Sequence, residues 1–159
     1  MTGDTLHRAR PGWTGAADPV HAQVRRLRLV GLAAVGYLLV ASALAVVLRW
    51  PGQFAGPDGA ERIVAESLTH GTALSPPVPL VLAFAGAVWL ATGRHAGYVL
   101  GCTLLVLLSM AFIICGLGEA RVPVTHDVPR AALVLSGATS ALLVGAVVVT
   151  AVQRFLAGR

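Results

Sequence analysis

The stretch LVGLAAVGYLLVASALAVVL, residues 29–48, contains twenty consecutive residues without a charge. A helix rises about 1.5 Å per residue, so this stretch is long enough to cross the roughly 30 Å hydrocarbon core of a bilayer. Three further uncharged runs follow at residues 78–93, 98–117 and 131–152. With allowance for helix caps, the sequence predicts membrane-spanning helices at about 29–48, 76–93, 98–117 and 131–152.

The composition supports the same class. Of 159 residues, 56% are hydrophobic and 12% are charged, whereas a soluble domain usually carries about a quarter charged residues. The connection at residues 93–97 is so short that the helices on either side of it must form an antiparallel hairpin. We therefore predict an all-α integral membrane protein, an antiparallel bundle of four transmembrane helices. This domain covers residues 18–157 and follows a disordered cytoplasmic tail at residues 1–17.

The arginines predict the orientation. If both termini are cytoplasmic, eight arginines lie inside and four outside, as the positive-inside rule requires. We expect a multi-pass protein of the cell membrane with Arg25, Arg26 and Arg28 at the lipid headgroups. The arginines are scattered, so the net charge of +5 does not indicate a nucleic-acid partner. Because all twelve basic residues are Arg in a chain rich in Ala, Gly and Val, a GC-rich bacterial source is expected.

A cleaved signal peptide is the competing interpretation of the first span. The basic start, the apolar run and the small residues Ala41-Ser42-Ala43 fit such a leader. However, the apolar run continues to Leu48, and the leader would exceed the usual length of about 15–30 residues. Retention of the first span is favoured, and cleavage would leave three spans.

The outer loop, residues 49–75, contains a helical pattern. Asp58 and Glu61 form a variant of the capping box, and Ala60, Val64 and Leu68 follow at intervals of four residues. We predict a short amphipathic helix at residues 59–69 that lies on the outer surface as a lid over the ends of the spans.

Catalytic chemistry has one candidate location, in the outer loops. Glu66, His70, His126 and Asp127 are the residue types of an acid/base or metal site. Their spacing fixes no metal geometry, because the chain has no His-x-x-x-His or Cys-x-x-Cys. Solvated loop charge is the favoured interpretation, and we predict no catalytic residue, metal or cofactor.

The fourth span carries the clearest signal for helix contacts. Gly137, Ala141 and Gly145 repeat every four residues, with Ser136 and Ser140 on the adjacent stripe. Small residues at this spacing allow the backbones of two membrane helices to approach closely. The partner is predicted to be another helix of the same chain, a second copy in a homo-oligomer, or a helix of another protein.

Three functions remain open. The predicted spans hold no ionisable side chain, whereas proton- and ion-coupled carriers usually keep one at membrane depth. We therefore favour a non-enzymatic structural or accessory subunit. The first alternative is an oligomeric transporter or channel for a neutral solute. Its path would be lined by Tyr37, Ser136, Thr139 and Ser140. The second alternative is a membrane enzyme with an outer-face His/carboxylate site.

Overall fold

The computed structural model describes residues 19–52, 58, 61–93, 96–121 and 128–157. This part of the chain is helical, without named strands, and its five helices are α1 (Pro19–Val47), α2 (Ile63–Thr69), α3 (Val78–Ala91), α4 (Ala96–Arg121) and α5 (Arg130–Ala157). The predicted tail at residues 1–17 lies outside the described residues.

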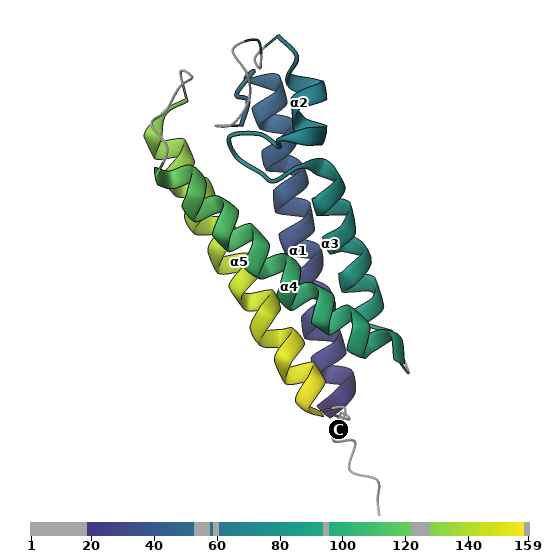
Figure 1. Ribbon diagram of the computed structural model, residues 1–159. Helices are drawn as coiled ribbons and strands as arrows, with labels where there is room; N and C mark the ends of the chain where they lie inside the picture. Colours follow the sequence, from purple (N-terminus) through teal and green to yellow (C-terminus); the bar gives the residue numbers. More distant parts are fainter. Residues whose placement is uncertain (1–18, 53–57, 59–60, 94–95, 122–127, 158–159) are drawn as a thin grey trace, which may run out of the picture.

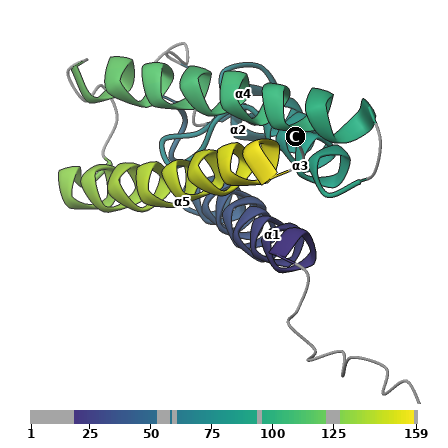
Figure 2. The ribbon, with the colours of Figure 1, turned by 90° about the horizontal axis from the view of Figure 1, so that it is seen from below.

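Four of the helices run side by side (Figures 1 and 2). Helix α1 packs on α3 and α5, and α4 packs on the same two helices, so neighbours in this ring are antiparallel. The start of α1, the end of α5 and the connection between α3 and α4 lie at one end, which we call the termini end. Helix α2 lies at the opposite end, which we call the loop end.

Three helices are long and apolar enough to cross a membrane: α1, α4 and α5. Helix α3 has only 14 residues, which corresponds to about 21 Å. It begins later than predicted because Pro77 is extended, with ψ 137°, and acts as the N-cap. It ends at Ala91, where the Thr92 hydroxyl donates to the carbonyl of Trp89 at 2.9 Å. The helix in the second predicted span is therefore shorter than residues 76–93.

The three long helices, α1, α4 and α5, extend beyond the apolar runs. Helix α1 begins at Pro19, helix α4 continues to Arg121 past Gly116 and Gly118, and helix α5 continues to Ala157. A charged or glycine residue after an apolar run ends the span but need not end the helix, because the backbone hydrogen bonds continue into the interface.

The surface of the helices is apolar. Only 33%, 22% and 17% of the residues in the apolar windows of α1, α4 and α5 are buried. Large exposed side chains include Val47 on α1, Trp89 on α3, Ile114 on α4 and Leu142 on α5. Monomers in water rarely expose contiguous apolar patches of more than a few hundred Å². The helices are thus consistent with a membrane protein whose outer surface contacts lipid.

The core is densest toward the termini end. Its buried residues come from all four packed helices: Leu27, Ala34, Phe84, Ala87, Val88, Ala91, Cys102, Leu105, Val147 and Ala151. The rings of Phe84 and Phe112 meet with centroids 5.5 Å apart and join α3 to α4. At Gly101 the two backbones come closest, because a Cβ there would lie 2.7 Å from the Cα of Ala91. The expected hairpin of the second and third apolar runs is therefore present, with α3 pressed against α4.

Candidate functional site

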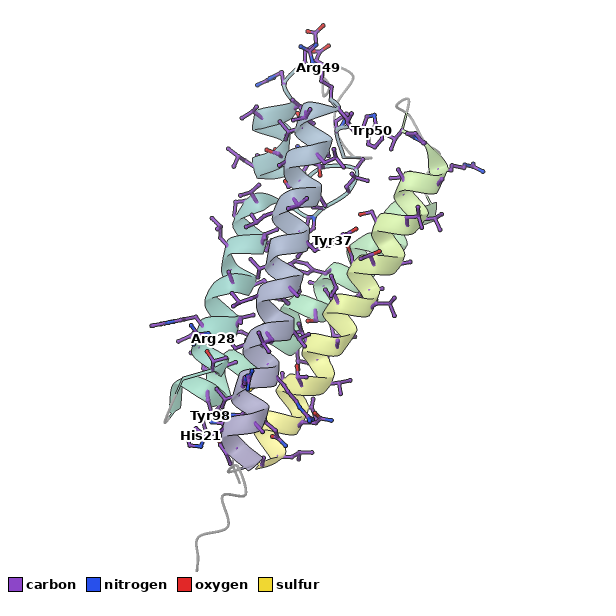
Figure 3. All side chains as sticks on the ribbon, turned by 180° about the vertical axis from the view of Figure 1, so that it is seen from behind. His21, Arg28, Tyr37, Arg49, Trp50 and Tyr98 are labelled. Atoms are coloured by element: carbon purple, nitrogen blue, oxygen red, sulfur yellow. The ribbon has the colours of Figure 1, made fainter. Side chains whose placement is uncertain are left out.

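The site at the loop end begins where α1 stops. The N–H of Trp50 donates to the carbonyl of Ala45 at 2.8 Å, and the N–H of Arg49 donates to that of Val46 at 3.2 Å. Arg49 has a positive φ of 55°. This is the Schellman pattern, which reverses the chain direction after a helix. It brings Trp50 against Ala45 and turns the following residues back over the bundle (Figure 3).

A buried non-helical segment then fills the gap between α1 and α5. We call residues Gly71–Ser75 the wedge segment, and all five are buried. Figure 1 shows this part of the chain crossing from α2 over α1 toward α5. Gly71 has φ 83°, and a Cβ there would lie 2.8 Å from the carbonyl oxygen of Ser75. Only glycine fits both the conformation and the space.

The wedge segment satisfies most of its own polar groups. The N–H of Thr72 donates to the carbonyl of Ser75 at 2.9 Å, and the Thr72 hydroxyl accepts from the N–H of Ser75 at 3.2 Å. The N–H of Ala73 donates to the carbonyl of Trp50 at 3.2 Å. Irregular backbone is tolerated at membrane depth only where protein supplies its hydrogen bonds. This segment meets that condition.

Two long helices hold the wedge segment through hydroxyl groups. The Ser136 hydroxyl of α5 donates to the carbonyl of Leu74 at 2.9 Å. The Tyr37 hydroxyl of α1 lies 3.2 Å from the Ser136 hydroxyl oxygen, which can accept its proton. Leu74 also packs in a cluster with Ala41 and Ala45. We call this Tyr37–Ser136–Leu74 arrangement the hydroxyl latch.

The latch contains no titratable group suited to acid/base chemistry at neutral pH. Tyr37 and Ser136 were two of the four residues expected to line a path for a neutral solute. Both are instead engaged in holding the wedge segment, while Thr139 and Ser140 are half-buried on α5. The arrangement can fasten the loop end of the molecule. The sequence showed the two hydroxyls but not the Leu74 carbonyl that accepts from Ser136, because nothing local marks Leu74 as buried.

Helix α2 differs from the predicted amphipathic helix. It covers Ile63–Thr69 rather than 59–69, and its N-cap is Arg62 without a side-chain cap hydrogen bond. Asp58 contributes its backbone carbonyl, which accepts from the N–H of Arg62 at 3.1 Å. The two residues of the predicted apolar stripe whose exposure the structure describes, Val64 and Leu68, are 66% and 52% exposed, while Ile63 and Ser67 are buried.

Two of the four candidate catalytic residues lie together. His70 Nδ1 is 2.6 Å from Glu66 Oε2, and the Thr69 hydroxyl is 2.9 Å from the same nitrogen. His126 and Asp127 lie outside the described residues. Within the described residues no three His, Cys, Asp or Glu side chains gather into a possible metal site. Because the His70 side chain is 50% exposed, the pair is an i, i+4 contact on a short helix rather than an enclosed site.

The small-residue stripe of α5 is divided between two environments. Ser136 faces inward in the hydroxyl latch, whereas Gly137 and Ala141 are exposed and Gly145 is half-buried. A Cβ added at Gly137 or Gly145 would meet nothing within 4 Å. Packing within the chain therefore does not require these two glycines.

The sequence did not predict a buried arginine at the termini end, Arg154, which was counted among the eight arginines inside. Arg154 is only 6% exposed, and its guanidinium carbon lies 4.7 Å from the ring centroid of Tyr98. This cation–π contact joins α5 to α4. The signal was available, since Arg154 follows the buried Val147 and Ala151 at helical intervals of four and three residues.

Comparison with protein-family models, with curated proteins and with solved structures gives no match. The function of the chain is therefore inferred from its residues and their geometry.

Proposed function

We propose that this chain is a multi-pass protein of the cell membrane in which α1, α3, α4 and α5 all cross the bilayer, with both termini cytoplasmic. The short helix α3 is supported in this role by its tight contact with α4 at Gly101 and by exposed apolar side chains such as Leu82 and Trp89. The buried wedge segment precedes α3 and extends the apolar layer at the loop end. Extended residues and local bilayer thinning can compensate for a helix shorter than the membrane.

Within that membrane the chain acts as a non-enzymatic accessory subunit that binds other transmembrane helices. The observation that carries this proposal is the open space at Gly137 and Gly145 on α5. Glycine in a helix interior costs about 1 kcal/mol relative to alanine in water, and these two glycines relieve no crowding inside the chain. A partner helix that approaches closely would supply the missing reason for their small size. The partner can be a second copy or another protein.

The transporter alternative has less support. A neutral path along α5 would need the hydroxyls of Tyr37 and Ser136, and both point into the hydroxyl latch. The enzyme alternative rests on Glu66 and His70, which form an i, i+4 pair in which the His70 side chain is 50% exposed. Neither arrangement favours a second proposal.

The test is the size of the complex formed by Gly137→Leu. Leucine at this position would prevent a partner helix from approaching closely. We therefore expect the amount of partner that co-purifies in mild detergent to fall at least about tenfold. Native mass spectrometry gives the stoichiometry, whether the partner is a second copy or a foreign chain. The matched control is Gly36→Leu, because Gly36 on α1 is also exposed with nothing within 4 Å of its Cβ position, but the residues four positions away, Leu32 and Val40, are large and exposed and form no small-residue stripe. A wild-type chain that is always monomeric, or equal loss in both variants, would contradict the proposal.

A further inference from the structure

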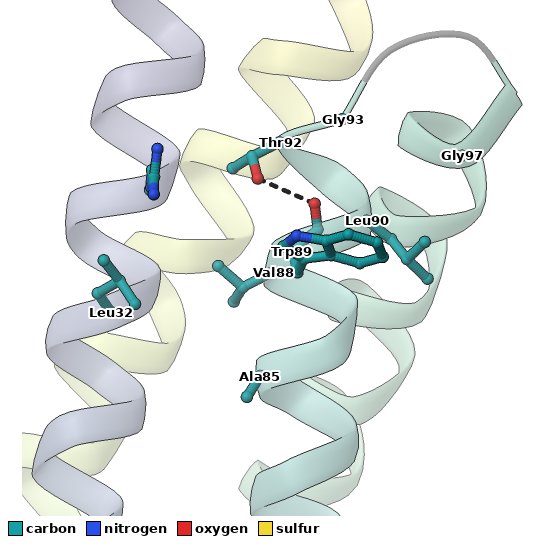
Figure 4. Close-up of a pocket in the computed structure, with 9 residues that line it drawn as sticks. Leu32, Ala85, Val88, Trp89, Leu90, Thr92, Gly93 and Gly97 are labelled. Carbon is teal, nitrogen blue, oxygen red and sulfur yellow. Dashed lines mark hydrogen bonds between the residues drawn. The ribbon is translucent and has the colours of Figure 1, made fainter.

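A groove opens between α1 and α3 on the half of the molecule nearer the termini end (Figure 4). Its volume is about 520 Å³, and its lining includes Arg28, Leu32, Ala85, Trp89 and Thr92. Figure 4 shows Leu32 of α1 on one side and Trp89 and Thr92 of α3 on the other. The groove is open on its outer side, toward the apolar surface of the helices.

The packing of α1 on α3 closes the floor of this groove. A Cβ at Gly31 would lie 2.6 Å from Cγ1 of Val88, so the two helices are in close contact at this level. Val88 is itself buried and forms part of the floor of the groove. Because α1 and α3 are antiparallel, Arg28 lies toward the same end as Thr92, and Leu32 lies deeper, toward Ala85.

The groove is therefore polar at one end and apolar along its length. The polar end is lined by Arg28, which is exposed, and by Thr92, whose hydroxyl donates to the Trp89 carbonyl. The deeper part is lined by Leu32, Ala85 and the indole of Trp89, which is 75% exposed. Tryptophan is enriched at the membrane interface, where its ring reaches from headgroups to acyl chains.

Charge complementarity identifies the ligand that fits. The carboxylates whose side chains the structure describes, Asp58, Glu61 and Glu66, all belong to the loop between α1 and α3 at the loop end. Arg28 lies on α1 at the other half of the molecule (Figure 3) and forms no ion pair with any of them. A cation at headgroup depth without a carboxylate partner attracts a phosphate.

We propose that the groove holds one anionic phospholipid, with its phosphate on Arg28 and one acyl chain along Leu32, Ala85 and Trp89. This inference rests on the proposed membrane location, because it places Arg28 at the level of the headgroups. It separates Arg28 from Arg25 and Arg26, which are exposed on α1 but do not line the groove. Of these three arginines, only Arg28 combines its positive charge with a groove that can hold an acyl chain.

The experiment measures lipid binding to the full chain in neutral detergent by native mass spectrometry. The probes are phosphatidylglycerol and phosphatidylcholine with the same acyl chains. Wild type is expected to bind one phosphatidylglycerol per chain, at least about tenfold more tightly than phosphatidylcholine. Arg28→Gln should remove that preference, and Ala85→Leu should weaken both lipids by filling the groove. The matched control is Arg26→Gln, which should change the preference less than about threefold.

Three results would overturn the inference. The first is equal loss in Arg28→Gln and Arg26→Gln, which indicates general attraction to charge. The second is the absence of any headgroup preference in wild type. The third is displacement of the lipid by glycerol 3-phosphate alone, which indicates a phosphate site without a chain groove. Resistance of the native protein to alkaline carbonate extraction is measured in parallel. If the chain is extracted, the membrane proposal fails. If it is retained and one of these three lipid results is obtained, only the lipid site is wrong.

Discussion

Gly101→Ala is expected to destabilise the protein by about 3 kcal/mol, the upper range for adding a methyl group to a packed interior. A Cβ at this position of α4 would lie 2.7 Å from the Cα of Ala91 and 2.7 Å from the carbonyl carbon of Leu90. Both atoms belong to the backbone of α3, so no side-chain rotation can make room. The α3–α4 hairpin would have to separate. Titration with a denaturing detergent, followed by circular dichroism or tryptophan fluorescence, measures the loss.

The controls for this prediction are glycines with free space. A Cβ at Gly86 on α3 would meet nothing within 4 Å, and the same is true of Gly137 on α5. Gly86→Ala and Gly137→Ala should therefore change stability by no more than about 1 kcal/mol, the difference in helix propensity between the two residues. If Gly101→Ala behaved like these controls, the close contact of α3 with α4 would be refuted.

Ser136→Ala is expected to open the loop end of the molecule. It removes the donor to the Leu74 carbonyl and one of two acceptors of the Tyr37 hydroxyl, which can still donate to the backbone carbonyl of residue 136, 3.3 Å away. Hydrogen bonds between membrane segments contribute about 0.6 to 1.7 kcal/mol each, so we expect a loss of about 1 to 2 kcal/mol. Hydrogen exchange of the wedge segment, residues 71–75, should increase more than exchange in the middle of α1 or α5.

The matched control is Ser140→Ala, one helical turn further along α5. Ser140 is half-buried, but in the described part of the chain its hydroxyl forms no hydrogen bond to another segment. This variant should leave exchange in the wedge segment unchanged. Tyr37→Phe should have about half the effect of Ser136→Ala, since it leaves the Ser136–Leu74 bond intact. Equal exchange in all three variants would show that the hydroxyl latch does not hold the wedge segment.

The sequence predicted the class of the fold because the length of an apolar run can be counted directly and compared with the thickness of a bilayer. Residues 29–47 lie within α1, and the short connection after Gly93 correctly indicated the hairpin of α3 and α4. The extent of α3 was overestimated because Pro76 and Pro77 were placed in the first turn of the helix, where proline is tolerated, although Pro77 is extended and acts as the N-cap. Backbone conformation determines where that helix begins.

The candidate sites were harder to predict because they depend on distant partners. Ser136 was predicted as a helix-packing residue, but its acceptor was not predicted, because it is 62 residues away at Leu74 in a segment with no regular pattern. The periodicity on α2 shows which residues share a face, not which face is covered. The burial of Arg154 was not predicted because its charge was given more weight than its register with Val147 and Ala151.

The central claim is that α3 crosses the membrane, so that the chain crosses four times with both termini in the cytoplasm. It is tested by single-cysteine variants at His21, Asp58 and Arg94 in a chain whose Cys102 and Cys115 are replaced by alanine. A membrane-impermeant maleimide is applied to intact cells whose outer envelope is permeable to it. We predict labelling of Asp58→Cys only, with His21→Cys and Arg94→Cys labelled after the membrane is opened. Labelling of Arg94→Cys from outside, together with Asp58→Cys, would show that α3 does not cross and would contradict the account.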